Sequence, residues 1–145
     1  MKESISYTFL LNIIITFIVI SFFVIMCIMS YTKAFRVNSK IVNAIEISEG
    51  YNVVAKTEID RTITNYGYQK LNITCPKKEG QNAIGYNGIE LPDNKTTDGT
   101  CVYKFENGDK YSYGVITYMT FDFPIVSTLI RIPVYTRTMS LYKLG

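Results

Sequence analysis

The sequence contains no histidine, and this absence limits the chemistry that a chain of 145 residues can perform. Ser-His and Cys-His nucleophile pairs and most zinc sites need an imidazole. The phosphate loop GxxxxGK(S/T) is missing as well, and the scattered aspartates form no calcium-loop pattern. The segment DNKTTDGT (93–100) places two acidic residues near a glycine, where a cation could bind, but a solvated turn is the simpler interpretation. We therefore predict no enzymatic activity, no cofactor and no metal site.

Charge is absent from residues 4–32, and neither proline nor glycine interrupts this part of the chain. Residues 10–29 alone give about 20 residues, or about 30 Å as a helix, which matches the hydrocarbon core of a bilayer. We predict that residues 1–32 form an N-terminal tail and a single transmembrane helix, with the lipid bilayer as its partner.

A cleaved signal peptide is the main alternative, but its apolar region is usually about 7–15 residues long and ends at a small-residue cleavage site. Thr32 and Ala34 form a poor site, with Lys33 between them. A lipoprotein is also disfavoured, because FVIMC lacks the small residues that precede a lipidated cysteine.

Two features disagree about the side of the membrane on which the rest of the chain lies. Lys33, Arg36 and Lys40 follow the apolar run, whereas Lys2 alone precedes it. The positive-inside rule then favours a cytoplasmic C-terminal domain, although the rule is weaker when a long domain follows. In either orientation, we expect Lys33 and Arg36 to reach the lipid headgroups while their stems stay in the apolar layer.

The cysteines indicate the opposite orientation. Cys75 and Cys101 are the only two beyond the apolar run, and their spacing fits no zinc pattern. A disulfide between them would contribute about 3.5 kcal/mol in the chain-entropy model, and such bonds persist outside the cytosol. Two unpaired buried thiols are the alternative. We predict a cell-membrane protein with a cytoplasmic N-terminus and an extracytoplasmic C-terminal domain.

Polar residues inside the apolar run fall on one side of the predicted helix. At about 100° per residue, Thr8, Asn12 and Thr16 lie within about 80° of one another, and Ser21 lies on the other side. The same sector also contains Ser4, Cys27 and Ser30. Because a polar stripe in lipid usually faces another helix, we predict that Thr8, Asn12 and Thr16 make a helix–helix contact. The alternative is an ordinary anchor, in which the hydroxyls bond back to their own helix.

Residues 33–66 are predicted to form an amphipathic stalk of one or two helices. Small or apolar residues recur at steps of three and four, which is typical of one helix face. We predict that the packing face contains Val37, Ile41, Ala44 and Ile45. Gly50 either ends a first helix or is tolerated inside a longer one at a cost of about 1 kcal/mol. Asn65 and Gly67 predict a helix stop near Tyr66.

Residues 67–145 are predicted to form a small antiparallel sheet, so that the chain belongs to the α+β class. YQKLNITC (68–75) predicts a strand with Leu71, Ile73 and Cys75 on one face. Residues 76–100 are rich in Gly, Asn, Asp and Pro and predict a loop, whose base the disulfide would close.

The last part of the chain gives the strongest strand signals. A hairpin is predicted around Asn107-Gly108, which suits a tight turn with positive φ. Alternate residues of the second strand share a face, namely Tyr111, Tyr113, Val115, Thr117, Met119, Phe121 and Phe123. Pro124 is expected to end or bend that strand, and PIVSTLI (124–130) is either a short helical turn or a crossover. RIPVYTRTMSLYK (131–143) reads as the last strand, at an edge because of Pro133.

This layout resembles a pilin-like protein, and within that group it looks most like the TadE-type pseudopilins of tight-adherence pili. The likeness is carried by AFRVNSKIVNAIEISEG (34–50) and by the closing TYMTFDFPIVSTLIRIPVYTRTMSLYK (117–143). It implies a subunit of a bacterial surface pilus or of its secretion and assembly apparatus. The implied partners are other pilin-like or envelope assembly subunits, including copies of itself.

The chain departs from the pilin pattern at its N-terminus. Prepilin peptidases cut after a glycine just before the apolar segment, but the first glycine of this sequence is Gly50. Glu3 precedes the apolar run, so the role of the family's glutamate does not transfer to it.

A second hypothesis uses the same elements differently. The chain would be a membrane-tethered extracytoplasmic binding or sensor module, or an accessory subunit of a conjugation or secretion machine, with recognition by the 76–100 loop and the tyrosine-rich sheet. Nucleic acid is not an expected partner, because Lys and Arg alternate with Asp and Glu and form no basic stripe.

Overall fold

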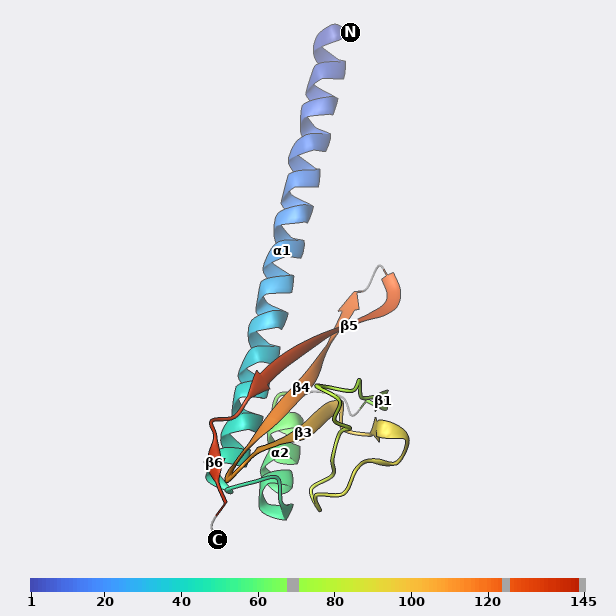
Figure 1. The fold of residues 1–145 in the computed structure, drawn as a ribbon. Helices are drawn as coiled ribbons and strands as arrows, with labels where there is room; N and C mark the ends of the chain where they lie inside the picture. The colour runs from blue at the N-terminus through green and yellow to red at the C-terminus, as the bar shows by residue number, and fades with distance from the viewer. Residues whose placement is uncertain (68–70, 124–125, 144–145) are drawn as a thin grey trace. The chain divides into compact units, whose positions relative to one another are not determined.

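The computed structural model describes residues 1–67, 71–123 and 126–143, with the side chains of 119–130 outside the description. The chain divides into two compact units, Met1–Lys33 and Ala34–Gly145. The first unit is helical from Lys2 onward. The second unit contains the end of the same helix, a second helix and all the described strands (Figure 1).

Helix α1 extends from Lys2 to Ile47 and contributes to both units. The ambiguity at Gly50 is resolved, because α1 ends at Ile47, before Gly50, and a second helix follows. Gly50 N donates to Ile45 O (2.9 Å) and Glu49 N donates to Glu46 O (3.1 Å). These are the two bonds of a Schellman motif, in which the residue after the cap is left-handed. Here that residue is Glu49 (φ 53°) rather than a glycine.

Helix α2 (Val53–Asn65) begins at a cap that also serves α1. The Asn52 Oδ1 accepts from Val54 N and Ala55 N, both at 3.0 Å, while its Nδ2 donates to Ser48 O at 2.9 Å. One side chain therefore satisfies backbone groups at the end of one helix and at the start of the next. The predicted stop is confirmed, since α2 is capped at Tyr66.

The main sheet is antiparallel and confirms the predicted α+β class. Its strands are β3 (Thr100–Asn107), β4 (Lys110–Phe123) and β5 (Val126–Arg137) in that order, and β6 (Leu141–Tyr142) also pairs with β4. The predicted hairpin joins β3 to β4 through a two-residue loop, with Asn107 opposite Lys110 and Gly108 at φ 62°. A smaller sheet pairs β1 (Ile73–Thr74) with β2 (Lys95–Thr96), next to the short 3-10 helix η1 (Pro92–Asn94).

The prediction of a helical turn or crossover for 124–130 is wrong over 126–130, where β5 begins. Phe123 pairs with Val126, so the two strands form a second hairpin. β-branched residues at Val126, Thr128 and Ile130 favour this extended pairing over a helical turn. Pro124 lies outside the described residues, although β4 ends at Phe123 just before it.

The strand predicted over 131–143 is divided in two, because residues 138–140 separate β5 from β6. The expected edge position of Pro133 is confirmed among the described strands, where β5 pairs only with β4. Tyr118, opposite Pro133, donates its N–H to Gly99 O on the β3 side (3.2 Å). This position of the ladder therefore needs no N–H from Pro133, which has none to give.

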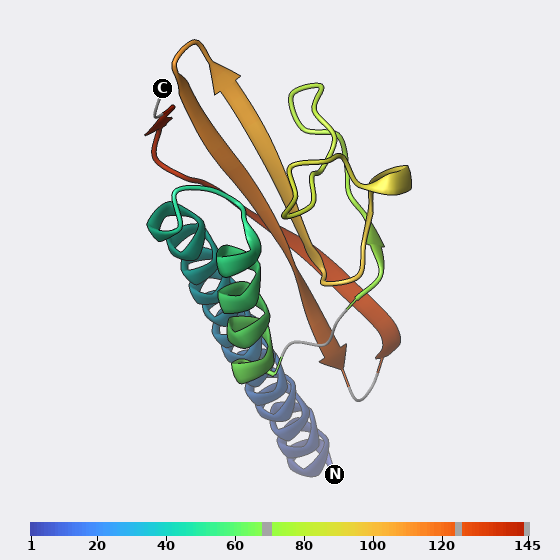
Figure 2. The ribbon, with the colours of Figure 1, turned by 90° about the horizontal axis from the view of Figure 1, so that it is seen from below.

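The sheet is covered on both faces within the second unit. Helix α2 and residues 34–47 of α1 lie on one face, and the segment before β3 lies on the other (Figure 2). Alternate residues of β3 and β4 point to each side. Val102, Tyr113 and Val115 join the helix-side cluster, whereas Tyr103, Phe105 and Ile116 join the cluster around the cysteines.

Candidate membrane-embedded interaction site

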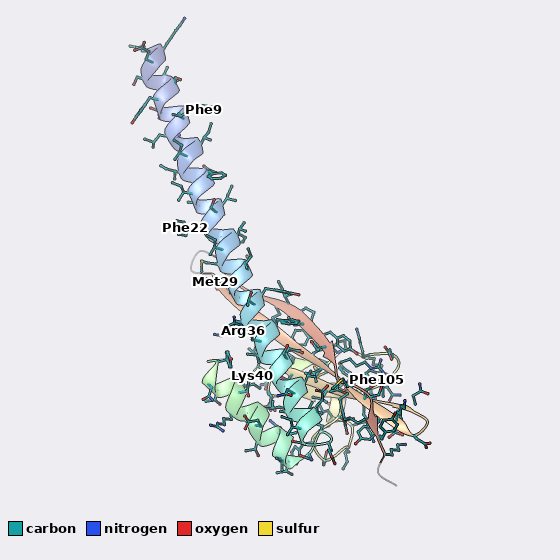
Figure 3. All side chains as sticks on the ribbon, turned by 90° about the vertical axis from the view of Figure 1, so that its left-hand side faces the viewer. Phe9, Phe22, Met29, Arg36, Lys40 and Phe105 are labelled. Carbon is teal, nitrogen blue, oxygen red and sulfur yellow. A yellow bond between two sulfur atoms is a disulfide. The ribbon has the colours of Figure 1, made fainter. Side chains whose placement is uncertain are left out.

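Among the described residues, one helix is long and apolar enough to cross a membrane, and it is α1. Within the first unit its large apolar side chains project outward all round and are exposed, among them Phe9, Phe22 and Met29 at 65–68% (Figure 3). Apolar surface of this extent is costly in water, at about 25 cal/mol per Å². A lipid environment removes that cost, so the segment suits a bilayer.

Four hydroxyl groups in this segment are bonded to their own helix. Thr8 Oγ1 donates to Ser4 O (3.0 Å), and Thr16 Oγ1 donates to Asn12 O (2.8 Å). Ser21 and Thr32 bond in the same way to Phe17 O and Ile28 O, each at 2.8 Å. A hydroxyl bonded four residues back can lie in lipid without another partner. The polarity of Thr8 and Thr16 therefore does not by itself require a second helix.

Asn12 differs from these hydroxyl residues. Within the described chain its side-chain amide has no hydrogen-bond partner, and its side chain is exposed. The contact predicted for Thr8, Asn12 and Thr16 stays a prediction, but Asn12 is the member of the set with unused donors and an unused acceptor.

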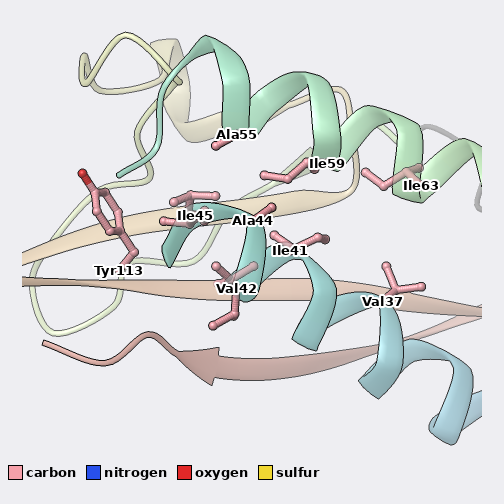
Figure 4. Packing of buried hydrophobic residues seen from close by; sticks show 11 residues of the cluster. Val37, Ile41, Val42, Ala44, Ile45, Ala55, Ile59, Ile63 and Tyr113 are labelled. Carbon is pink, nitrogen blue, oxygen red and sulfur yellow. The ribbon is translucent and has the colours of Figure 1, made fainter. Parts of the chain in front are cut away.

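The predicted stalk face packs inside its own chain. Val37, Ile41 and Ile45 have no exposed surface and Ala44 has 7%. These side chains face Ala55, Ile59 and Ile63 of α2 on one side and the sheet on the other (Figure 4). Helical periodicity identified the buried face, but that face leaves nothing for contact with another subunit.

Sequence reasoning missed Asn38, which fixes α1 to the sheet. It is fully buried, and its Nδ2 donates to Val134 O (2.8 Å), Thr117 Oγ1 (3.0 Å) and Val115 O (3.2 Å). Two hydrogens are shared among three acceptors. The Oδ1 is buried without a partner among the described residues. The sequence does contain a signal for its burial, because Asn38 lies four residues after Ala34 and three before Ile41, on the same helix face.

The disulfide predicted between Cys75 and Cys101 is present, with the two Cα atoms 5.8 Å apart. It closes the base of the 76–100 loop, as expected. Asn94 holds the loop from within, since its Oδ1 accepts from Ala83 N (2.7 Å) and its Nδ2 donates to Cys75 O (2.9 Å). Tyr103, on β3, adds a hydrogen bond from its hydroxyl to Pro76 O.

The 95–99 segment is tied to α2 by an ion cluster. Lys56 Nζ lies 2.6 Å from Asp60 Oδ1 and 2.5 Å from Asp98 Oδ2. Burial lowers the pKa of Lys56, but the hydrogen bonds to Asp60 and Asp98 outweigh this effect and leave the pKa raised. Burial raises the pKa of the neighbouring Tyr51 to about 12. The described residues contain no group of His, Cys, Asp and Glu that could hold a metal ion.

A groove of about 840 Å³ runs between the last part of α1 and α2, within the second unit. Ala44 and Thr62 lie at its buried floor. At one end, Ile47, Val53 and Val54 are 64–74% exposed. Such a cluster of exposed aliphatic side chains is a candidate contact surface.

The charged residues that follow the apolar run differ in their surroundings. Lys33 and Arg36 are exposed, and their contact with lipid headgroups stays a prediction. Lys40 instead lies over the ring of Tyr66, 5.0 Å from its centre, so it takes part in the packing of the second unit.

No protein-family model, curated protein or solved structure matches this chain.

Proposed function

We propose that this protein is a non-enzymatic, single-pass membrane-anchored subunit of a pilin-like assembly, on the cell surface or in the secretion apparatus that builds one. The observation that carries the proposal is the make-up of α1. The same helix supplies a membrane-length apolar segment with exposed side chains and the central buried helix of a small α+β unit. The resemblance to TadE-type pseudopilins supports the same role.

The orientation in this proposal places the second unit outside the cytosol. The Cys75–Cys101 bond supports it, because disulfides persist in oxidising compartments. Lys33 and Arg36 favour the reverse orientation, but the positive-inside rule loses weight when more than about 60 residues follow the membrane segment. The disulfide is therefore the stronger indicator of the orientation in the membrane.

Assembly in this proposal depends on the membrane segment, since Val37, Ile41 and Ile45 are already buried within the chain. Replacing residues 2–32 by an unrelated apolar helix tests this dependence. Envelope proteins crosslinked to the wild-type chain in living cells should be lost from the exchanged chain. A non-reducing gel that shows the Cys75–Cys101 bond in both chains serves as the folding control. An unchanged set of crosslinked proteins contradicts the proposal.

The groove between α1 and α2 favours a second candidate, a membrane-tethered binding or sensor module. In that case the anchor is passive and recognition uses the exposed aliphatic end of the groove. Val54→Asp should then abolish partner capture, whereas Thr64→Asp, at an exposed position of α2 outside the groove, should leave it intact. Under the assembly proposal, the anchor exchange has the larger effect of the two.

A further inference from the structure

The unpaired amide of Asn12 lies well inside the apolar run. Residue 18 is the middle of the uncharged run 4–32, so Asn12 is six residues, or about 9 Å along a helix, from that middle. The hydrocarbon core extends about 15 Å to each side of its centre. Asn12 is therefore within the layer where water cannot satisfy its donors and acceptor.

An amide in hydrocarbon needs a partner, and the described residues of its own chain supply none. The hydroxyls of Thr8 and Thr16, one turn away on either side, are already bonded to backbone carbonyls. A partner must then come from another membrane helix at the same depth. Because an amide has both a carbonyl oxygen and an N–H₂ group, its best complement is a second amide.

We propose that two copies of this chain pair in parallel through their membrane helices, with Asn12 of each hydrogen-bonded to Asn12 of the other. The inference rests on the membrane-anchored role proposed above and names the partner of that segment. Two copies inserted in the same orientation carry Asn12 at the same depth. The reciprocal N–H···O bonds are then formed without any other polar residue.

The surface around Asn12 suits a close helix pair. Positions seven residues apart drift by only about 20° per step, so Ile5, Asn12, Val19 and Met26 form one row. A row of this kind is the seam of a two-stranded coiled coil, where a single asparagine fixes the register and the number of strands. Shallow hollows of about 330 and 430 Å³ flank Asn12 along the helix, where side chains of the second copy can insert.

Disulfide crosslinking in membranes tests the pair with the full-length chain. Cys27→Ser removes the free thiol, and Cys75–Cys101 stays bonded. In that background, Val19→Cys places a thiol on the Asn12 row, and Ser21→Cys places one about 180° away as the matched control. Mild oxidation should give a product of twice the chain's mass for Val19→Cys, at least tenfold above Ser21→Cys.

The role of the amide is tested in the same assay. Adding Asn12→Leu should lower the yield of the Val19→Cys dimer about tenfold, because two interhelical bonds are lost. Asn12→Gln keeps an amide and should retain most of the yield. Equal yields for Val19→Cys and Ser21→Cys, a Val19→Cys product with a different protein, or a yield that Asn12→Leu leaves unchanged each overturns the inference.

The outcome is separable from the test of the proposed function. If the anchor exchange removes the envelope partners but Val19→Cys gives no dimer, the pairing is refuted and the assembly role stands. If the dimer forms but the anchor exchange changes no partner, the pairing stands and the assembly role is refuted.

Discussion

Replacing Asn38 by leucine is expected to destabilise the second unit by about 2 kcal/mol, because two buried hydrogen bonds are lost at about 1 kcal/mol each. Leucine has the same branched shape and the same number of side-chain heavy atoms, so it removes the amide but keeps a side chain of similar reach beside Ile41. Asn38 Nδ2 lies 2.8–3.2 Å from three acceptors on β4 and β5, and leucine offers no N–H to them. The substitution also removes the Oδ1, whose burial without a partner destabilises the wild-type fold. This gain offsets part of the stability lost with the hydrogen bonds.

Asn43 provides the control, since it is an exposed asparagine on the same helix. Asn43→Leu should change stability by less than about 0.5 kcal/mol. Thermal unfolding of the full chain in detergent should show the midpoint of Asn38→Leu about 8 °C below wild type, at about 4 °C per kcal/mol for a unit of this size. Equal midpoints for the two variants would refute the view that Asn38 fixes α1 to the sheet.

Three further predictions concern the second unit. Glu49→Gly should raise the free energy of unfolding by about 1 kcal/mol in a denaturant titration. Glycine adopts the left-handed conformation (φ 53°) without steric cost, and the change removes a negative charge at a helix C-terminus. A destabilised variant would contradict this reasoning. Converting Cys75 and Cys101 together to alanine should cost about 3.5 kcal/mol for a separation of 26 residues, and an unchanged denaturation midpoint would contradict it. Stability should also fall as pH rises from about 10 to about 12, because the pKa of Tyr51, raised by burial to about 12, makes the unfolded chain lose its proton first. Tyr51→Phe should lessen the decline between about pH 10 and about 12, and an identical decline would contradict that cause.

Helix boundaries were predictable because their signals are local. Uninterrupted spacing of apolar residues predicts α1, while Asn65 and Gly67 mark the end of α2. Gly50 was marked only as a possible helix end, and the left-handed residue at the end of α1 is Glu49, one position earlier. The preference of glycine for that conformation is only about 1 kcal/mol, which the surrounding contacts of a folded unit can override.

Long-range partners were not predictable in the same way. The periodicity of Val37, Ile41 and Ile45 indicates that this helix face is buried, but it cannot distinguish burial against α2 from burial against another subunit. Asn38 shares the face, yet its role depends on carbonyl groups 77 and 96 residues further along the chain. Residues 126–130 were misassigned because a short apolar run fits a strand and a helical turn equally well.

The candidate site shows the same contrast between what local sequence patterns predict and what only the structure shows. Sequence pattern grouped Thr8, Asn12 and Thr16 as one polar stripe, and their side-chain geometry separates them. A threonine on a helix can bond to the carbonyl four residues back, as both do here. Asn12 is not bonded in this way among the described residues, and it is therefore the position at which a partner helix is expected.

The central claim is a membrane-anchored chain whose second unit lies outside the cytosol, and labelling of two engineered cysteines in intact cells tests it most directly. Arg61→Cys lies on α2 at a side chain that is 72% exposed, and Lys2→Cys lies before the apolar run. In a Cys27→Ser background, a membrane-impermeant maleimide should label Arg61→Cys in intact cells and Lys2→Cys only after lysis. Labelling of Lys2→Cys in intact cells, with Arg61→Cys reached only after lysis, would contradict the account.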